Sequence, residues 1–306
     1  MFDYSFTVAY ISAKETSILT KDALARITAD KQDSLRLLAQ TGYGGGVDGS
    51  SVDVLTDNEL SALRKFVTEA LPQELYSLLI LPYDAHNLKV LLKCRINGAD
   101  PKPYLYDNTM FDTEIAAACC RGGEFSLLSD KIAETLNPAF DSDALNLPFG
   151  ISTECDKAFY ADISFRAQSA PKPIAEYVAA ETDGKNYMSF LRAKNIGLSS
   201  ADFRPLMLPG GSVPVQALIS AYESGAEELR SYTFGYDAHY AFCEAAENAK
   251  KSFSEAADAL DRYAQSKLEP YKYEPEHPAP VFLYFKKKTV EARHIREAFA
   301  GVGGVL

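Results

Sequence analysis

The chain has 306 residues, of which 47% are hydrophobic and 24% are charged, so it is long enough to bury a sizeable core. Its formal net charge of −11 argues against nucleic-acid binding, because phosphate recognition needs clustered Lys and Arg. The same charge argues against direct adsorption to anionic lipid. Any association with a membrane is therefore expected to run through another protein.

Targeting and membrane signals are missing from the sequence. No stretch reaches the ~18 consecutive apolar residues of a membrane-spanning helix. The opening residues, Met1 to Tyr4, have neither the basic nor the apolar region of a secretory signal. The five cysteines lack C-x-x-C spacing, so they predict free thiols in a reducing cytoplasm rather than a zinc site or a disulfide framework.

Residue patterns that start, continue and end helices dominate the first two thirds of the chain. Thr56-x-x-Glu59 has the form of a capping box that opens a helix, and Pro72 marks the end of that helix or a kink in it. Further helices are expected over 3–20, 21–40, 111–121, 127–136, 155–168, 174–195, 213–222 and 224–232.

The last third carries the longest helical signal. Between Gly235 and Pro270 no Gly or Pro interrupts an apolar stripe, which predicts one helix of about 30 residues. The best strand candidate, residues 281–285, lacks alternation and is interpreted as the buried first turns of a helix that starts after Pro280. The predicted fold class is therefore all-α.

One short pattern occurs three times, as an acid-x-x-(Asn or His) element followed by an apolar run with a cation. Its members are Asp84, Asn87 and Lys93 in the first copy, Asp183, Asn186 and Arg192 in the second, and Glu291, His294 and Arg296 in the third. The copies start about one hundred residues apart, and such a period indicates a repeated structural unit. It predicts three similar helical subdomains, approximately 1–97, 98–197 and 198–306, around a pseudo-threefold axis.

The pattern has a structural interpretation that needs no catalysis. The acid is expected early in a helical segment, where it interacts favourably with the helix dipole. Asn87 and Asn186 are expected to hydrogen-bond an adjacent helix or loop. The cations Lys93 and Arg192 suit a position near the helix C-terminus or one that faces a cavity.

Signatures of chemistry are weak throughout. Gly42 to Gly46 lacks the Gly-Lys-Ser/Thr ending of a phosphate loop, so it is interpreted as a flexible helix–helix connection. Asp84 and His86 would point to different faces of a helix, and the four histidines have no metal-ligand spacing. No G-x-S-x-G element is present. No catalytic, cofactor-binding or metal-binding residue is predicted.

In order and spacing, the chain resembles the C-subunit family of bacterial and archaeal V/A-type ATPases, whose eukaryotic equivalent is the d-type subunit of the V-ATPase. The threefold Asp-x-x-Asn element carries the resemblance, with Lys89 as a further match in the first copy. Supporting stretches are Tyr4–Tyr10, Leu38–Tyr43, Leu206–Gly211 and Phe285–Arg296. The chain departs from the family pattern where His294 replaces the usual Asn and where the second copy carries Gly184 and Tyr187.

The resemblance implies a three-lobed, funnel-shaped helical protein that is not itself catalytic and needs no cofactor. Such a protein sits on the cytoplasmic face of the membrane rotor ring, and its cavity receives central shaft subunits of the D and F type. It thereby couples the shaft to the ring for proton or sodium transport linked to ATP. The sequence does not select the ion, nor the direction in which the enzyme runs.

Two other classes of function stay open at this stage. A helical scaffold or adaptor outside any ATPase would use the same repeats to hold different proteins, and the genes next to this one would separate it from a rotary component. A helical enzyme with an unrecognised site would instead need a deep pocket with converging titratable groups.

Overall fold

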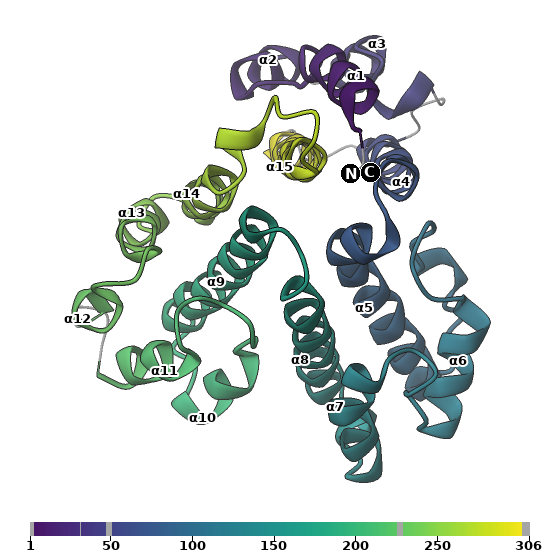
Figure 1. Cartoon of the computed structure of the whole chain (residues 1–306), viewed down its shortest axis with the longest axis vertical. Helices are drawn as coiled ribbons and strands as arrows, with labels where there is room; N and C mark the ends of the chain where they lie inside the picture. The colour runs from purple at the N-terminus through teal and green to yellow at the C-terminus, as the bar shows by residue number, and fades with distance from the viewer. Residues whose placement is uncertain (1–2, 31, 47–50, 225–228, 302–306) are drawn as a thin grey trace. The chain divides into compact units, whose positions relative to one another are not determined.

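A computed structural model describes residues 3–30, 32–46, 51–224 and 229–301. Every regular element within these ranges is a helix, which confirms the predicted all-α class (Figure 1). The chain forms two compact units: unit 1 comprises 1–73 and 268–306, and unit 2 comprises 74–267. The three repeats predicted from the sequence, with their pseudo-threefold axis and funnel shape, stay a prediction.

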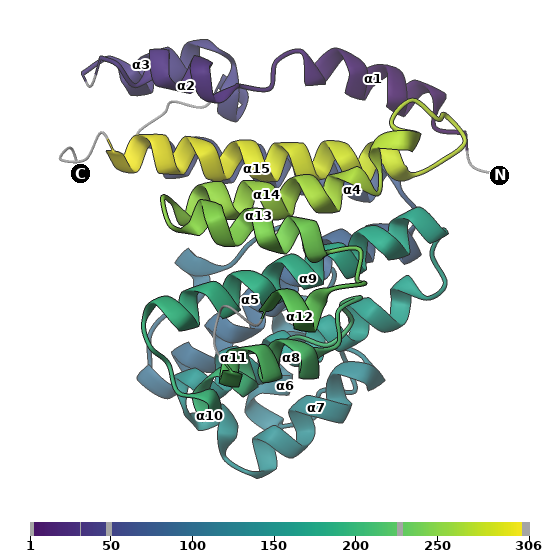
Figure 2. The ribbon, with the colours of Figure 1, turned by 90° about the vertical axis from the view of Figure 1, so that its left-hand side faces the viewer.

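Unit 1 joins the two ends of the chain around a pair of long helices. Its helices are α1 (Ser5–Glu15), α2 (Lys21–Ile27), α3 (Ser34–Gln40), α4 (Val52–Ala70) and α15 (Ala279–Gly301), with short 3-10 turns at Tyr43–Gly46 and Glu269–Tyr271. Helix α15 packs along α4, and α1 and α2 also contact α15 (Figure 2). A buried cluster that includes Leu38, Leu55 and Ile295 holds α3, α4 and α15 together.

Unit 2 is a run of helices in which sequence neighbours pack on each other. Its helices are α5 (Gln73–Asn97), α6 (Thr113–Gly122), α7 (Asp130–Asp141), α8 (Pro148–Ala167), α9 (Lys172–Asn195), α10 (Ser200–Phe203), α11 (Val215–Ser224), α12 (Leu229–Thr233), α13 (His239–Ala249) and α14 (Phe253–Ser266). Short 3-10 turns lie at Lys102–Tyr104, Ala144–Asn146 and Arg204–Leu206. Helix α9 packs on α8 and α14, and its Tyr187 ring stacks on Phe242 of α13 at 4.1 Å between centroids.

The long helix predicted between Gly235 and Pro270 is wrong, because the structure has two helices there. Helix α13 ends at Ala249, and α14 begins at Phe253. Between them the backbone of Ser252 is extended, and its hydroxyl accepts the N–H of Ser254 as an N-cap at 3.1 Å. The two helices fold back as a hairpin, so the apolar stripe of each is buried against the other.

The capping box predicted at Thr56-x-x-Glu59 is also wrong. Helix α4 starts earlier, at Val52, and the hydroxyl of Ser51 accepts the N–H of Val54 at 3.2 Å. Thr56 is buried inside the helix, where its hydroxyl donates to the Val52 carbonyl. The predicted stop at Pro72 is confirmed, since α4 ends at Ala70.

The remaining predicted helix boundaries agree with the structure to different degrees. Helices expected over 111–121, 127–136, 174–195 and 213–222 match α6, α7, α9 and α11 within a few residues. The segments 3–20 and 21–40 are shorter or interrupted, because α1 ends at Glu15 and residues 28–33 separate α2 from α3. Helix α8 begins at Pro148, well before residue 155. Residues 225–228 of the segment expected over 224–232 lie outside the described residues.

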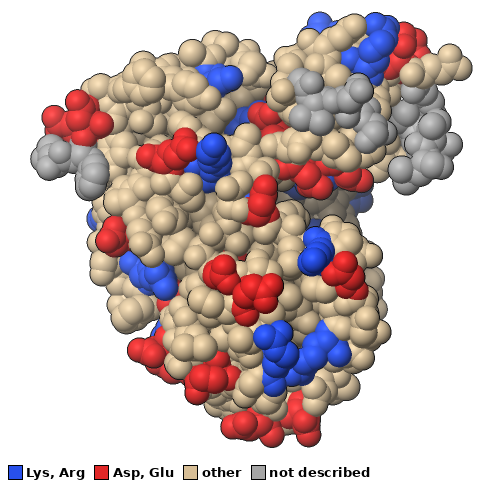
Figure 3. Space-filling view, turned by 90° about the vertical axis from the view of Figure 1, so that its right-hand side faces the viewer, with Lys and Arg blue, Asp and Glu red and all other residues tan. Residues whose placement is uncertain are grey.

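In the described part of the chain, no helix combines the length and apolar character needed to cross a bilayer. On the face drawn in Figure 3, Lys and Arg side chains form small groups interspersed with Asp and Glu. No large field of one sign covers the described residues on that face.

Candidate functional site

The first copy of the repeated pattern is a polar clamp on helix α5. The i, i+3 spacing places Asp84 and Asn87 on one face of the helix. The carboxylate of Asp84 accepts the N–H groups of Met110 at 3.0 Å and Phe111 at 2.9 Å. Asn87 donates to the Tyr106 carbonyl at 2.9 Å and accepts the Tyr106 N–H at 2.8 Å. Two side chains thus hold the backbone of segment 106–111.

The second copy makes the same clamp on helix α9. Asp183 accepts the N–H groups of Ser212 at 3.1 Å and Val213 at 3.0 Å, and it also accepts the Ser212 hydroxyl. Asn186 donates to the Leu208 carbonyl at 2.9 Å and accepts the Leu208 N–H at 2.7 Å. The predicted hydrogen bonds from Asn87 and Asn186 to an adjacent segment are therefore confirmed.

Gly211 shows how closely the second clamp is packed. A Cβ at this residue would lie 2.2 Å from an oxygen of Asp183, so any side chain would displace the carboxylate. The Pro-Gly-Gly-Ser stretch is thus shaped to bring backbone N–H groups onto Asp183. In the sequence, the adjacent glycines Gly210 and Gly211 are the feature that indicates this close approach of the backbone.

The third copy, on helix α15, recruits a different part of the chain. Glu291 accepts the N–H of Leu19 at 2.6 Å, and Leu19 lies just before α2 at the N-terminal side of unit 1. The same carboxylate pairs with Lys288 one turn earlier. Arg296 reaches α4, where it pairs with Asp57 at 2.7 Å. His294 is half-buried.

The predicted position of the acids early in their helices is wrong. Asp84, Asp183 and Glu291 all lie near the middle of α5, α9 and α15. Helix α5 starts before Pro82 and continues through it, which the pattern alone did not indicate. The acids therefore act as acceptors for the backbone of a packed segment rather than as partners of the helix dipole.

The cations of the pattern lie away from the clamps. Lys93 is exposed just before the last turn of α5 and Arg192 is exposed on the last turn of α9, which agrees with the predicted positions near a helix C-terminus. Another lysine of the first copy, Lys89, forms a salt bridge with Asp156 of α8 at 2.7 Å. Lys89 thus links two helices of unit 2.

Burial controls the ionisation of the three acids. It raises the pKa of Asp84 to about 6, although the N–H groups of Phe111 and Met110 oppose that shift. Burial also raises the pKa of Asp183, against the hydrogen bonds from Ser212 and Val213. The pKa of Glu291 is raised for the same reason, and the charge and hydrogen bond of Lys288 oppose it.

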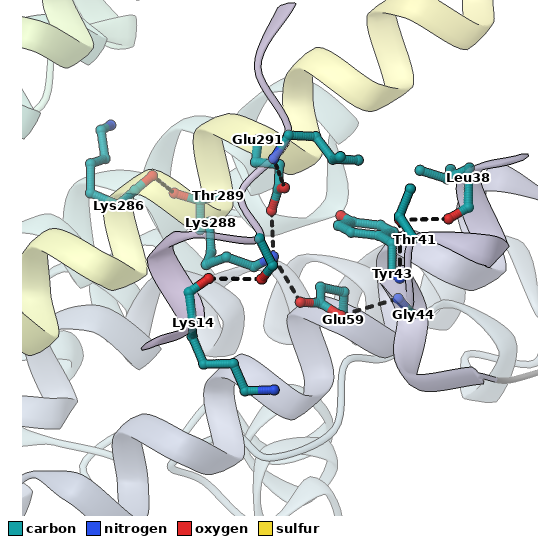
Figure 4. Close-up of polar contacts among 12 residues, drawn as sticks. Lys14, Leu38, Thr41, Tyr43, Gly44, Glu59, Lys286, Lys288, Thr289 and Glu291 are labelled. Atoms are coloured by element: carbon teal, nitrogen blue, oxygen red, sulfur yellow. Dashed lines mark hydrogen bonds and ion pairs between the residues drawn. The ribbon is translucent and has the colours of Figure 1, made fainter. Parts of the chain in front are cut away.

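Unit 1 contains a cavity of about 230 Å³ beside the third copy. Lys288 at this cavity contacts Glu291 of that copy (Figure 4). Tyr10, Phe66 and Tyr284 form its aromatic wall, and Lys288 lies at its polar side. The ammonium of Lys288 is 2.8 Å from a carboxylate oxygen of Glu59 and also contacts Glu291. Its side chain is only 6% exposed. Two carboxylates therefore compensate one buried ammonium.

Glu59 is the residue of this cavity that sequence reasoning missed. The sequence pattern places it in a capping box, whereas its carboxylate accepts the Gly44 N–H at 3.1 Å as well as pairing with Lys288. Gly44 and Gly45 have φ of 77° and 72°, and a Cβ at Gly44 would lie 2.7 Å from Leu55. The glycine run connects α3 towards α4 as expected, but its Tyr43–Gly46 turn has a defined conformation.

The described residues do not form a recognisable metal-binding site. Among those residues, no group of three or more His, Cys, Asp or Glu side chains is placed to hold a metal ion. A second hollow, lined by Asp84, Asn87 and Phe111, has a volume of about 10 Å³, which leaves room for no more than a single water.

Comparison with known proteins places this chain in a family. Residues 7–302 match the model of the ATP synthase (C/AC39) subunit family. The A-type ATP synthase C-subunit of Thermococcus kodakarensis is 23% identical over 99% of this chain and 87% of the relative. The corresponding proteins of Thermococcus gammatolerans and a Desulfurococcus species are 21% and 22% identical over 96% of this chain and 84% and 85% of theirs. The chain belongs to the ATP synthase (C/AC39) subunit family.

Proposed function

We propose that this chain is a non-catalytic rotor component in the central stalk of a V/A-type rotary ATPase. In this role it connects central shaft subunits of the D and F type to the membrane rotor ring, on the cytoplasmic face. Rotation would then couple ATP to proton or sodium transport. The observation that carries the proposal is the family match, which extends over residues 7–302.

The clamps supply a physical reason why such a chain suits mechanical transmission. A coupling element must pass torque without yielding, and close-packed interiors have low compressibility. Asp183 and Asn186 are almost completely buried and join α9 to segment 208–213 through paired hydrogen bonds. Asp84 and Asn87 do the same for α5 and segment 106–111. Irregular segments are thereby fixed to long helices.

Three similar lobes around a pseudo-threefold axis are part of the proposal. The first two clamps share the same side-chain geometry on α5 and α9, as a repeated unit requires. A cavity lined by all three lobes is where the shaft would be received. The N–H of Leu19 gives the third copy its partner from the N-terminal side of the chain.

Affinity purification of the tagged full chain from gently solubilised membranes of its own host tests the proposal. We expect mass spectrometry to recover the catalytic head, the shaft subunits and the membrane ring together with the chain. A clean chain, under conditions in which the rotary complex survives, would contradict the proposal and favour a scaffold or adaptor function.

A second measurement separates coupling from catalysis. Disrupting the second clamp with Asp183→Ala is expected to lower the yield of the assembled complex. The same variant should leave ATP hydrolysis by the isolated catalytic head unchanged, because the proposed role places no catalytic group on this chain. Hydrolysis by the isolated head that depends on adding the wild-type chain would contradict a non-catalytic role.

A further inference from the structure

We propose that the cavity of unit 1 is a receptor for an arginine side chain presented by a neighbouring protein of the complex. The chemistry of the ligand follows from residues of unit 1, and its source in a partner protein rests on the proposed function. Lysine, with its smaller and non-planar cation, would occupy the same cavity more weakly.

Aromatic rings give the cavity a surface that attracts cations. The rings of Tyr10 and Phe66 have centroids 5.3 Å apart, and Tyr284 meets Phe66 edge to face at 5.8 Å. All three line the cavity. The negative faces of such rings attract a guanidinium electrostatically, and its planar shape stacks on them. An aromatic wall of this kind selects for a planar cation over an anion.

The buried charges at the polar side of the cavity favour the same ligand. Lys288 is compensated twice, by Glu59 and by Glu291, so the three groups together carry a net negative charge when both acids are ionised. Burial and these carboxylates raise the pKa values of Tyr43 and Tyr284. Glu59 keeps part of its carboxylate accessible, since its side chain is 23% exposed. An entering guanidinium would form a charge-assisted contact with that accessible part of the Glu59 carboxylate.

An anionic ligand would find fewer available hydrogen-bond donors and cations in this cavity than a cationic ligand would find acceptors. The N–H groups of Gly42 and Gly45, which line the cavity, already donate to the carbonyls of Ala39 and Gly42. Lys14 lies at the exposed rim, with its ammonium 5.7 Å from the Tyr10 ring, and Lys288 is engaged by two carboxylates. Tyr43 also lines the cavity, but its hydroxyl is buried and so offers no accessible donor to an anion.

The size of the cavity points to one side chain rather than a cofactor. Sites for drug-sized ligands occupy about 300–1,000 Å³. At about 230 Å³ the cavity of unit 1 falls below that range. It suits a single protruding side chain, which a partner protein would hold in place through its own surface.

The ligand chemistry is tested first on the purified full chain. Because the chain contains no Trp, Phe66→Trp or Tyr10→Trp places a single fluorescent reporter in the cavity wall. Ethylguanidinium chloride is titrated at constant ionic strength, with sodium propionate as the anionic probe. We expect a saturable fluorescence change with ethylguanidinium and none with propionate. A saturable response to propionate alone, or to neither probe with both reporters, would overturn the proposal.

Two substitutions assign the binding to the cavity charge. Combined with the reporter, Glu59→Gln is expected to weaken ethylguanidinium binding about tenfold, as loss of one charge-assisted contact predicts. Glu69→Gln, on the exposed face of the same helix, is the matched control and should change nothing. Should Glu59→Gln reduce folding, Ala62→Lys at the exposed rim gives the same test by repulsion. Unchanged affinity in folded Glu59→Gln and Ala62→Lys variants would overturn the assignment.

The partner is tested in the assembled complex. A photo-crosslinking amino acid at Ala62 is expected to capture a peptide of another ATPase component, with an arginine near the crosslink. Co-purification of ATPase subunits without such a crosslink would overturn the docking proposal and leave the rotor function standing. Absence of ATPase subunits from the purified material would instead contradict the rotor function, and the partner with it, while the titration decides the ligand chemistry.

Discussion

The clamps of the two units use the same kind of acid but are closed by different parts of the chain. In unit 2, Asp84 and Asp183 bind backbone N–H groups 26 to 30 residues further along. In unit 1, Glu291 binds the N–H of Leu19, 272 residues away in sequence. The acid therefore specifies a contact between a long helix and a packed segment, and does not require the segment to follow the helix.

The units also differ in how they satisfy the polar groups beside the acid. In unit 2 the amides of Asn87 and Asn186 each make paired hydrogen bonds to a single residue. In unit 1 the polar partner of Glu291 is instead a buried lysine, Lys288, which lies one turn earlier in α15. A charged network costs more to disrupt than a neutral one, because a remaining buried charge has no compensation.

Removal of the buried ammonium is expected to give the largest effect. Lys288→Met keeps much of the side-chain volume but leaves Glu59 and Glu291 without their shared partner, at a cost of about 3–5 kcal/mol in the free energy of unfolding. The control, Lys89→Met, disrupts a pair whose lysine is 23% exposed and should cost no more than about 1 kcal/mol. Chemical denaturation measures both, and equal losses would contradict the difference between the units.

Acidification is expected to stabilise the first clamp. The pKa of Asp84 is about 6 in the folded chain, above its ordinary 3.8, so the folded state binds the proton more tightly than the unfolded state. The resulting stability is fully present below about pH 3.8 and is lost as the pH rises through 6. The full stabilisation is about 3 kcal/mol, and roughly half of it is lost between pH 5 and pH 7.5.

Asp84→Asn should remove that pH dependence, because the amide does not titrate. Denaturation midpoints measured at pH 5 and pH 7.5 should differ less in the variant than in the wild type. The comparison uses the slope with pH, so any pH-independent cost of the substitution cancels. A variant with the wild-type slope would show that Asp84 is not the titrating group.

The packing around the second clamp gives a smaller, steric test. Gly211→Ala would place its Cβ 2.2 Å from Asp183 and push the carboxylate off its N–H partners, at a cost of about 1–3 kcal/mol. Gly122→Ala is the control, since nothing lies within 4 Å of its Cβ and the residue is helical. That substitution should be neutral or slightly stabilising. Similar thermal midpoints for the two variants would argue against a tightly packed clamp.

The smallest effect is expected at the exposed end of the third copy. Arg296 pairs with Asp53 and Asp57 on α4, but both carboxylates are exposed and the Arg296 side chain is 37% exposed. Arg296→Gln should therefore cost less than about 1 kcal/mol, and added salt should shrink the difference. A loss as large as that of Lys288→Met would place Arg296 in the buried network rather than on the surface.

Much of the local structure could be predicted from the sequence, because helices are specified by nearby residues. The all-α class and the end of α4 before Pro72 follow from periodicity and breakers. The hydrogen bonds of Asn87 and Asn186 follow from the polarity of a residue placed among buried neighbours. The family also follows, since the resemblance drawn from the motifs agrees with the family match over residues 7–302, although the relatives are only about one fifth identical.

Only the tertiary structure decided which segments the polar residues meet. Ser252 breaks a continuous apolar stripe into α13 and α14 because capping and hairpin packing outweigh helix propensity there. Glu59 matches a capping motif, yet it binds Gly44 and Lys288 because the helix starts earlier and α15 lies alongside. Glu291 finds Leu19 through the packing of α15 with the N-terminal segments. Sequence spacing sets the face on which a side chain lies, whereas its partner depends on long-range packing that no local pattern encodes.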